Sequence, residues 1–431
     1  MLTHNVAHPV RSLVTAFLAW KTFLLIVALG AGVGPAYDTS STLLYERASS
    51  AEWFFDLPTR LTRWDAIYFM QMSRRGYLFE QEWAFGSGLP AVISFFTKTL
   101  TNYGIGSDVS LPPLLGVVVA NSSHLLSALV LYKLGLVVRL NARVSFIGAL
   151  LHILSPAGLF LSAPYNESPY ALLSFLGYLF FAKAVLSEKR TMAHDISIVV
   201  AGVWSGFALT FRSNGILNGV PFAVEFIREL TSPTTFGSIR RRLALVVGGS
   251  AIAVGFVLPQ LVAYLDFCFD PNDDDARPWC SKRIPSVYSF AQEHYWNVGF
   301  LRYWTPGNIP LFLLAAPMLY LLSQSGLDVL TWPSSSIATA TQPPQNVVST
   351  AQRYWFRSMA SAQLILTALA ITTYHIQIIT RISSGYPLWY WWLASKLSSK
   401  EKARFGGQVV VFMVMYAGIQ GALFASFLPP A

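Results

Sequence analysis

Charged residues are scarce in this chain of 431 residues. Asp, Glu, Lys and Arg make up 12% of the sequence, whereas soluble domains carry roughly 25%. Hydrophobic residues make up 54%, and many of them gather in long runs with almost no charge. Runs of this kind match helices that cross a bilayer. The composition excludes an ordinary soluble protein and predicts an all-α polytopic membrane protein, a single integral-membrane domain over residues 1–431.

Cysteines and the common catalytic motifs are also scarce. The two cysteines, Cys268 and Cys280, lie in one polar loop, where they allow a disulfide if that loop faces an oxidising compartment. Neither has neighbours that would complete a metal site, so we expect no metal. The P-loop, HExxH and GxSxG motifs and the dinucleotide-binding fingerprint are absent from the sequence. We therefore expect no cofactor and no nucleotide-driven chemistry, and substrates that are borne by the membrane.

Apolar runs of spanning length predict about eleven helices. The first run, near residues 13–33, exceeds the apolar region of about 7 to 15 residues found in signal peptides, so we expect a retained helix. The segment 91–100 is too short to span and is expected to be re-entrant or interfacial. The eleven expected spans are 12–34, 112–138, 144–163, 169–187, 196–212, 215–228, 243–265, 308–322, 357–379, 386–395 and 406–428.

The loops between these spans fall into a basic set and an acidic set. The net charge of +9 therefore reflects membrane topology and does not indicate a nucleic-acid partner. By the positive-inside rule the basic loops are cytoplasmic, which places the N-terminus in the cytoplasm. Residues 35–111, which include an amphipathic helix, and residues 266–307 then form two large loops on the lumenal side. Residues 323–356 form a cytoplasmic loop.

The stretch "RLTRWDAIYFMQMSRRGYLFEQEWAFGSGLP" at residues 60–90 mixes carboxylates, guanidiniums and aromatic rings. Asp65 has two explanations: it completes a capping box with Thr62, or it takes part in chemistry. Glu82 is flanked by aromatic residues, which would partly desolvate it and make it a better base. Four residues at helical spacing predict one aromatic face on the lumenal membrane surface: Trp64, Ile67, Tyr68 and Met72.

Three further charged residues stand where charge is costly. Glu167 lies in a short, otherwise apolar turn and needs a partner or a water-filled site. Arg212 lies between two apolar segments, so it either forms an ion pair with Asp65 or Glu167 or contacts a phosphate. Arg381 lies beside aromatic rings at the lumenal end of an expected helix.

A second polar and aromatic cluster occupies residues 288–304. Rings with polar neighbours bind sugars and lipid head groups, and they also anchor helices at a membrane interface, so both explanations stay open. The residues of interest are Gln292, His294, Tyr295, Trp296 and Arg302.

Five motifs, in order over residues 60–318, resemble the GPI mannosyltransferase 2 family, the PIG-V class. They are "RWDAIYFMQMSRRGYLFEQEWAF", "SPAGLFLSAPYNES", "FRSNGIL", "SVYSFAQEHYWNVGFLRYW" and "IPLFLLAAP". The resemblance implies a GT-C-type glycosyltransferase of the endoplasmic reticulum membrane with its active site in lumenal loops. It implies transfer of the second mannose, α-1,6-linked, from dolichyl-phosphate mannose to the GPI-anchor precursor. One departure is Gly86-Ser87-Gly88, where the family usually has a second Phe and a Pro.

The resemblance implies that Asp65 is catalytic. The donor is β-linked and the product α-linked, so a single inverting displacement suffices, with Asp65 as general base. The expected donor phosphate-binding residues are Arg212, His294, Arg302 and Arg381. The expected acceptor and sugar-binding residues are Trp64, Glu82, Glu167, Gln292, Tyr295 and Trp296.

Two membrane-borne partners follow from this reading, dolichyl-phosphate mannose and the GPI precursor, and the sequence leaves open whether a small membrane subunit assists. Two alternatives to this function remain open. One is another dolichyl-phosphate-sugar transferase of the GT-C type. The other is a polytopic lipid or solute transporter without covalent chemistry, although polar residues gathered at lumenal helix ends favour an enzyme.

Overall fold

A computed structural model describes residues 8–31, 37, 38, 40, 58, 60–187, 190–269, 277–331 and 349–428. The regular elements within these residues are all helical. The α-helices are α1 (Pro9–Ala31), α4 (Asp65–Arg75), α5 (Gly88–Asn102), α6 (Leu111–Val137), α7 (Ala142–Ile153), α8 (Glu167–Val185), α9 (Met192–Phe211), α10 (Gly219–Leu230), α11 (Phe236–Cys268), α12 (Val287–Trp296), α13 (Ile309–Thr331), α14 (Thr350–Thr372), α15 (Ile379–Ile382), α16 (Leu388–Ser398) and α17 (Ala403–Ala425).

The predicted class, an all-α polytopic membrane protein, is confirmed. Among the described residues, seven helices are long and apolar enough to cross a membrane: α1, α6, α8, α9, α11, α13 and α17. The count of eleven spans is not confirmed. The helices α7, α10 and α16 contain 12, 12 and 11 residues, and at about 1.5 Å per residue they are shorter than the roughly 30 Å hydrocarbon core.

The ends of several elements differ from the expected loops. α13 continues to Thr331 and α14 begins at Thr350, so both helices run into the stretch 323–356 that was expected as a loop. Most of the remainder of that stretch, residues 332–348, lies outside the described residues, as do parts of the two expected lumenal loops. In the first of these loops, α5 is a helix of 15 residues that includes the short segment 91–100.

Glycines bring the long helices together. A Cβ atom on Gly202 of α9 would collide with the backbone of Gly248 of α11, and a Cβ on Gly255 of α11 would collide with Gly206 of α9. Small residues permit this close approach of two backbones, which is a common way of packing helices in membranes. The close packing holds the α9–α11 pair together, and α9 then ends at Phe211, immediately before Arg212.

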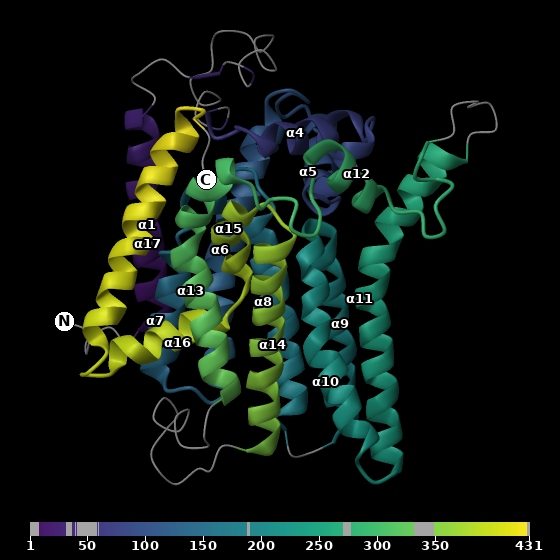
Figure 1. The fold of residues 1–431 in the computed structure, drawn as a ribbon, viewed down its shortest axis with the longest axis vertical. Helices are drawn as coiled ribbons and strands as arrows, with labels where there is room; N and C mark the ends of the chain where they lie inside the picture. The colour runs from purple at the N-terminus through teal and green to yellow at the C-terminus, as the bar shows by residue number, and fades with distance from the viewer. Residues whose placement is uncertain are drawn as a thin grey trace.

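The helices α4, α5 and α12 gather at one end of the bundle (Figure 1). The buried residues of α4 include Ala66, Phe69, Met70 and Ser73, at helical spacing, and this face packs into the core. The predicted membrane-facing aromatic face is therefore not formed as one surface. Met72 is buried, Tyr68 stacks on Phe85, and Trp64 contacts Phe427.

The predicted capping box at the start of α4 is wrong. Trp64, with φ +54°, is the N-cap residue, and its side chain makes no capping hydrogen bond. The Thr62 hydroxyl donates instead to the carbonyl of Pro58 at 2.9 Å. Asp65 is the first residue of α4, where a negative charge interacts favourably with the helix dipole. Its carboxylate is therefore available for another task.

Candidate active site

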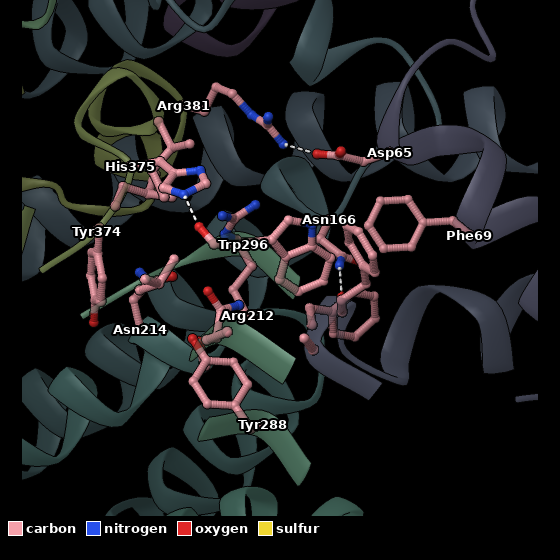
Figure 2. A pocket seen from close by; sticks show the side chains of 18 residues that line it. Asp65, Phe69, Asn166, Arg212, Asn214, Tyr288, Trp296, Tyr374, His375 and Arg381 are labelled. Atoms are coloured by element: carbon pink, nitrogen blue, oxygen red, sulfur yellow. Dashed lines mark hydrogen bonds and ion pairs between the residues drawn. The ribbon is translucent and has the colours of Figure 1, made fainter. Parts of the chain in front are cut away.

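A pocket of about 220 Å³ lies at this end of the bundle, between segments that are far apart in the sequence. α4 contributes Asp65, the end of α9 contributes Arg212, and α12 contributes Gln292 and Trp296. Arg381 comes from the short helix α15 on the opposite wall, as Figure 2 shows. The pocket therefore brings together five of the residues that the sequence singled out.

Two carboxylates and two guanidiniums form a continuous network along the pocket. Oε1 of Glu167 accepts hydrogen bonds from Nη1 of Arg212 at 2.7 Å and from Nε of Arg381 at 2.9 Å. Nη2 of Arg381 donates to Oδ2 of Asp65 at 3.2 Å. The Glu167 side chain is 0% exposed, whereas that of Asp65 is 36% exposed. Glu167 is therefore the buried centre of the network, and Asp65 is its solvent-facing end.

Helix ends explain why these charges are tolerated. Glu167 is the first residue of α8, and Arg212 directly follows the last residue of α9. Carboxylates are favoured at helix N-termini and cations at C-termini, and buried charges need partners. Arg212 therefore forms the ion pair with Glu167, one of the two partners expected. The same guanidinium lines the pocket, so the ion pair and a phosphate contact are compatible.

The Arg381 guanidinium remains positively charged. Burial alone would lower the pKa of this group, but the carboxylates of Glu167 and then Asp65 outweigh burial and raise it above its ordinary value. The guanidinium also lies 4.3 Å from the ring centroid of Phe160 and 4.9 Å from that of Tyr165, which places it over two aromatic faces. Arg381 is a fixed positive charge beside Asp65.

Several pocket residues were not identified as site residues from the sequence. His375 bonds with its Nε2 to the carbonyl of Trp296 at 3.0 Å and so joins the pocket wall to α12. Asn166 donates to the carbonyl of Phe85 at 2.7 Å. The hydroxyl of Tyr288 accepts a hydrogen bond from Ser213 at 2.8 Å, and burial raises its pKa. Two others, Asn214 and Tyr374, also line the pocket.

The sequence contained an indication for only some of the pocket residues that were missed. Asn166 precedes Glu167, and Asn214 lies in the helix break after Arg212, so both stand beside residues that were noticed. Tyr374 and His375 lie inside the expected span 357–379. The helix α14 ends at Thr372, which releases both residues into the pocket wall. An apolar run does not reveal where its helix stops.

Four residues expected to bind the acceptor do not line the pocket: Glu167, which is buried and paired with Arg212 and Arg381, and also Trp64, Glu82 and Tyr295. Glu82 is 1% exposed, and its carboxylate accepts from both Arg75 terminal nitrogens and from the backbone N–H groups of Leu78 and Phe79. Its hydrogen-bonding capacity is used in folding the loop between α4 and α5. Trp64 is the N-cap residue of α4, and the hydroxyl of Tyr295 bonds to Glu80 at 3.2 Å.

Two residues expected to bind the donor phosphate also lie outside the pocket lining. The imidazole of His294 stacks on Phe290 with the ring centroids 5.0 Å apart. Nη2 of Arg302 pairs with Glu293 at 2.8 Å, and both side chains are about half exposed, at 43% and 51%. The segment that follows α12 folds against the end of α14, with the N–H of Leu301 donating to the Thr372 carbonyl at 2.6 Å, and this turns Arg302 toward solvent.

A buried carboxylate connects the two polar segments above the pocket. Oε1 of Glu80 accepts a hydrogen bond from the indole Nε1 of Trp279 at 2.6 Å. Trp279 is fully buried and is the residue before Cys280, which forms a disulfide with Cys268 at the end of α11. The disulfide and the Glu80 contact together hold the start of the α12 segment against the 3₁₀ helix Glu80–Phe85.

The residues Gly86-Ser87-Gly88, where this sequence departs from the usual family pattern, pack against the end of α9. The N–H of Ser87 donates to the Thr210 carbonyl at 2.8 Å. A Cβ atom on Gly88 would lie 2.5 Å from the ring of Phe211, and one on Gly86 would lie 2.7 Å from the carbonyl oxygens of Thr210 and Phe211. Gly86 also has φ +85°, which favours glycine. The end of α9 occupies the space, so the small residues set the position of Arg212.

The described residues contain no cluster of three or more His, Cys, Asp or Glu side chains arranged as metal ligands. The positive charge in the pocket comes from Arg212 and Arg381, and the site offers a carboxylate base beside two anion-binding guanidiniums. Such a site suits the transfer of a group that leaves from a phosphate.

Comparison with known proteins identifies the family of this chain. The model of the family described as Mannosyltransferase (PIG-V) matches residues 24–431. The GPI mannosyltransferase 2 of Chaetomium globosum is 48% identical over 463 residues, covering 98% of this chain and 97% of that protein. The GPI mannosyltransferase 2 of Gibberella zeae is 44% identical over 428 residues, covering 99% and 98%.

A solved structure of the archaeal oligosaccharyltransferase from Archaeoglobus fulgidus is also similar, with a TM-score of 0.46 and 15% identity. That match covers 96% of this chain and 56% of the archaeal chain. The family resemblance read from the five sequence motifs is confirmed by the family model and by the fungal relatives. This chain belongs to the PIG-V mannosyltransferase family.

Proposed function

We propose that this pocket transfers mannose from dolichyl-phosphate mannose to the GPI-anchor precursor and adds the second mannose in α-1,6 linkage. The pocket would face the lumen of the endoplasmic reticulum, with the N-terminus in the cytoplasm. One observation carries the proposal. A partly exposed carboxylate, Asp65, and two guanidiniums, Arg212 and Arg381, converge on one pocket in a chain of the PIG-V family.

The proposed reaction is a single displacement with inversion. The 6-hydroxyl oxygen of the acceptor mannose attacks C1 of the donor mannose as the bond from C1 to the phosphate oxygen breaks. Asp65 takes the hydroxyl proton, and dolichyl phosphate leaves with one more negative charge than the donor phosphodiester carried. A positioned base contributes about 10²- to 10⁴-fold to such a step. Arg212 and Arg381 stabilise the charge that develops on the leaving phosphate.

Because Asp65 and Arg381 form an ion pair, binding of the donor phosphate at Arg381 would also affect Asp65. At 3.2 Å, the guanidinium competes with a substrate proton for Oδ2 of Asp65. A bound phosphate competes in turn for the guanidinium, because planar N–H pairs bind phosphate oxygens well. Donor binding would therefore draw Arg381 away from Asp65 and leave the carboxylate a stronger base at the moment the acceptor arrives.

The remaining predicted residues take revised roles under this proposal. Glu167 is buried and orients both guanidiniums, so it acts on the phosphate site through them. Trp296 and Gln292 line the pocket and remain the proposed sugar contacts. His294, Arg302, Glu82, Trp64 and Tyr295 lie outside the pocket lining and are not proposed as substrate contacts.

The decisive experiment replaces Asp65 with asparagine and follows GPI intermediates in microsomes. We expect Asp65→Asn to lower mannose transfer by about 10²- to 10⁴-fold and to accumulate the intermediate with one mannose. Asp328→Asn is the matched control, because Asp328 is also a partly exposed, ion-paired carboxylate, held by Lys396 away from the pocket. Normal two-mannose product from Asp65→Asn would contradict the base assignment. Accumulation of a different intermediate would instead indicate a dolichyl-phosphate-sugar transferase acting at another step.

A further inference from the structure

A second pocket, of about 210 Å³, is lined by four arginines. Arg139 follows the end of α6, Arg190 precedes α9, Arg228 lies on α10, and Arg241 lies on α11. The connection between α10 and α11, next to Arg228 and Arg241, lies at the opposite end of the bundle from α4 and α12 (Figure 1). The pocket therefore has no part in the chemistry proposed for Asp65, and it needs its own explanation.

Two carboxylates neutralise only part of this charge. Glu229 accepts two hydrogen bonds from Arg190, both at 2.9 Å. Glu225 accepts two from Arg228, at 2.8 and 2.6 Å, and lies 3.7 Å from Nε of Arg241. Among the residues that the structure describes, four guanidiniums face two carboxylates here, which leaves an excess of two positive charges.

Arg139 and Arg241 are the least neutralised of the four, because Arg241 shares the Glu225 carboxylate with Arg228 and no described carboxylate pairs with Arg139. Arg241 is 2% exposed, and its Nη2 donates to the Ala184 carbonyl at 2.9 Å, while its buried Nε has no hydrogen-bond acceptor among the described residues. The backbone N–H of Arg139 donates to the Leu136 carbonyl at 3.1 Å, but for its guanidinium the described part of the chain supplies neither a hydrogen bond nor an ion pair. Its backbone is left-handed, with φ +62°, at a position after a helix where glycine or asparagine is usual.

A helix N-terminus adds to the positive potential. α14 has 23 residues, and its N-cap residue Ser349 and second residue Ala351 both line the pocket. The first N–H groups of a helix have no intrahelical partner and carry a partial positive charge, which suits a bound anion. The positive-inside rule accounts for arginines at this end of the bundle. It does not account for four guanidiniums and a helix N-terminus around one pocket.

We propose that this pocket binds a phosphate monoester dianion. Guanidiniums bind phosphate oxygens through paired N–H groups, and two excess positive charges match the charge of a monoester. The phosphate belongs either to the headgroup of a lipid in the adjacent leaflet or to a soluble phosphate ester, since both present the same group at this end of the bundle. The proposal is independent of the transferase assignment.

The test uses the full-length protein in phosphatidylcholine nanodiscs and two probes with the same headgroup. Phosphatidic acid is added to the nanodisc in one arm, and soluble glycerol 3-phosphate is added to the buffer in the other. The readout is the rise in unfolding temperature with probe concentration at fixed ionic strength. Arg139→Gln is the test variant, and Arg143→Gln is the matched control, because Arg143 is exposed nearby and does not line the pocket.

We expect Arg139→Gln to bind the active probe about tenfold more weakly or worse, with Arg143→Gln within twofold of the unmodified protein. Saturation by phosphatidic acid alone would support the proposal and identify a lipid. Saturation by glycerol 3-phosphate would support it and identify a soluble ester. The proposal is overturned if neither probe raises the unfolding temperature. It is also overturned if both variants weaken binding equally, because that would indicate diffuse surface charge.

Discussion

Replacing Glu167 with glutamine gives a quantitative test of the charge network. Glu167 is 0% exposed and receives hydrogen bonds from Arg212 at 2.7 Å and Arg381 at 2.9 Å. The substitution keeps the size of the side chain and one acceptor oxygen, but removes the negative charge between two guanidiniums. We expect it to lower both stability and transfer, for the same physical reason.

The size of the stability loss follows from the contacts. Hydrogen bonds to charged groups contribute about 1.5–3 kcal/mol each, and breaking a buried ion pair costs roughly 3–5 kcal/mol. The glutamine oxygen retains one acceptor, and the Arg212 and Arg381 side chains are 17% and 14% exposed, so water relieves part of the cost. We therefore expect a loss near the lower limit, about 3 kcal/mol. Displacement of both guanidiniums would lower transfer about 10²-fold.

The measurements are the unfolding temperature of the purified protein and the rate of mannose transfer in microsomes at matched enzyme concentration. Glu82→Gln is the control. Glu82 is also a buried carboxylate, 1% exposed, but it pairs with Arg75 and not with the two guanidiniums of the pocket, Arg212 and Arg381. We expect both variants to unfold at lower temperature, and only Glu167→Gln to transfer slowly once folded enzyme is counted.

Two results would refute this reasoning. Destabilised Glu167→Gln enzyme with an unchanged transfer rate per folded molecule would show that the network is structural only. An equal loss of transfer in Glu82→Gln would show that any buried carboxylate at this end of the bundle has the same effect, so that the position of Glu167 between the arginines is not special.

Three further predictions concern other parts of the site. Gly88→Ala should cost about 1–3 kcal/mol through overpacking against Phe211 and slow transfer by moving the end of α9, and a normal rate in microsomes would contradict this. Cys268→Ser should lower stability by about 2–4 kcal/mol, because it removes the disulfide to Cys280 that closes a short loop. An unfolding temperature equal to that of the unreduced parent protein would refute this prediction. Arg302→Gln should leave the KM for dolichyl-phosphate mannose unchanged, because Arg302 pairs with Glu293 outside the pocket. A raised KM would contradict this and would support the earlier prediction that Arg302 binds the donor phosphate.

The approximate positions of the long helices, though not their count or their ends, and part of the site were predictable from the sequence, because both depend on local properties. Apolar runs locate the helices through their length and hydrophobicity alone. Glu167 and Arg212 were noticed because charge in an apolar setting is costly, and that cost is what pairs them in the structure. The choice of Asp65 as catalytic depended on the family resemblance, since its pattern alone was equally consistent with a cap.

The rest depended on packing between distant segments. The sequence of α4 has a second set of residues at helical spacing besides the aromatic face that was predicted. This second face includes Phe69 and Met70, and it is the one buried in the core. His294 and Arg302 shared a polar, aromatic stretch with Trp296, yet only Trp296 lines the pocket, because the segment after α12 turns back onto α14. No property of the stretch itself reveals which side chains face inward.

The ion pair between Asp65 and Arg381 joins residues 316 positions apart. A ribosome adding about 5–20 residues per second needs roughly 15–60 s to make the chain between them. For about the second half of that interval the growing polypeptide already holds Glu167 and Arg212, 45 positions apart, but lacks the guanidinium that links them to Asp65. The network is therefore assembled in two stages, a local pair first and a long-range closure last. The nascent chain would gain the complete charge network only near the end of its own synthesis.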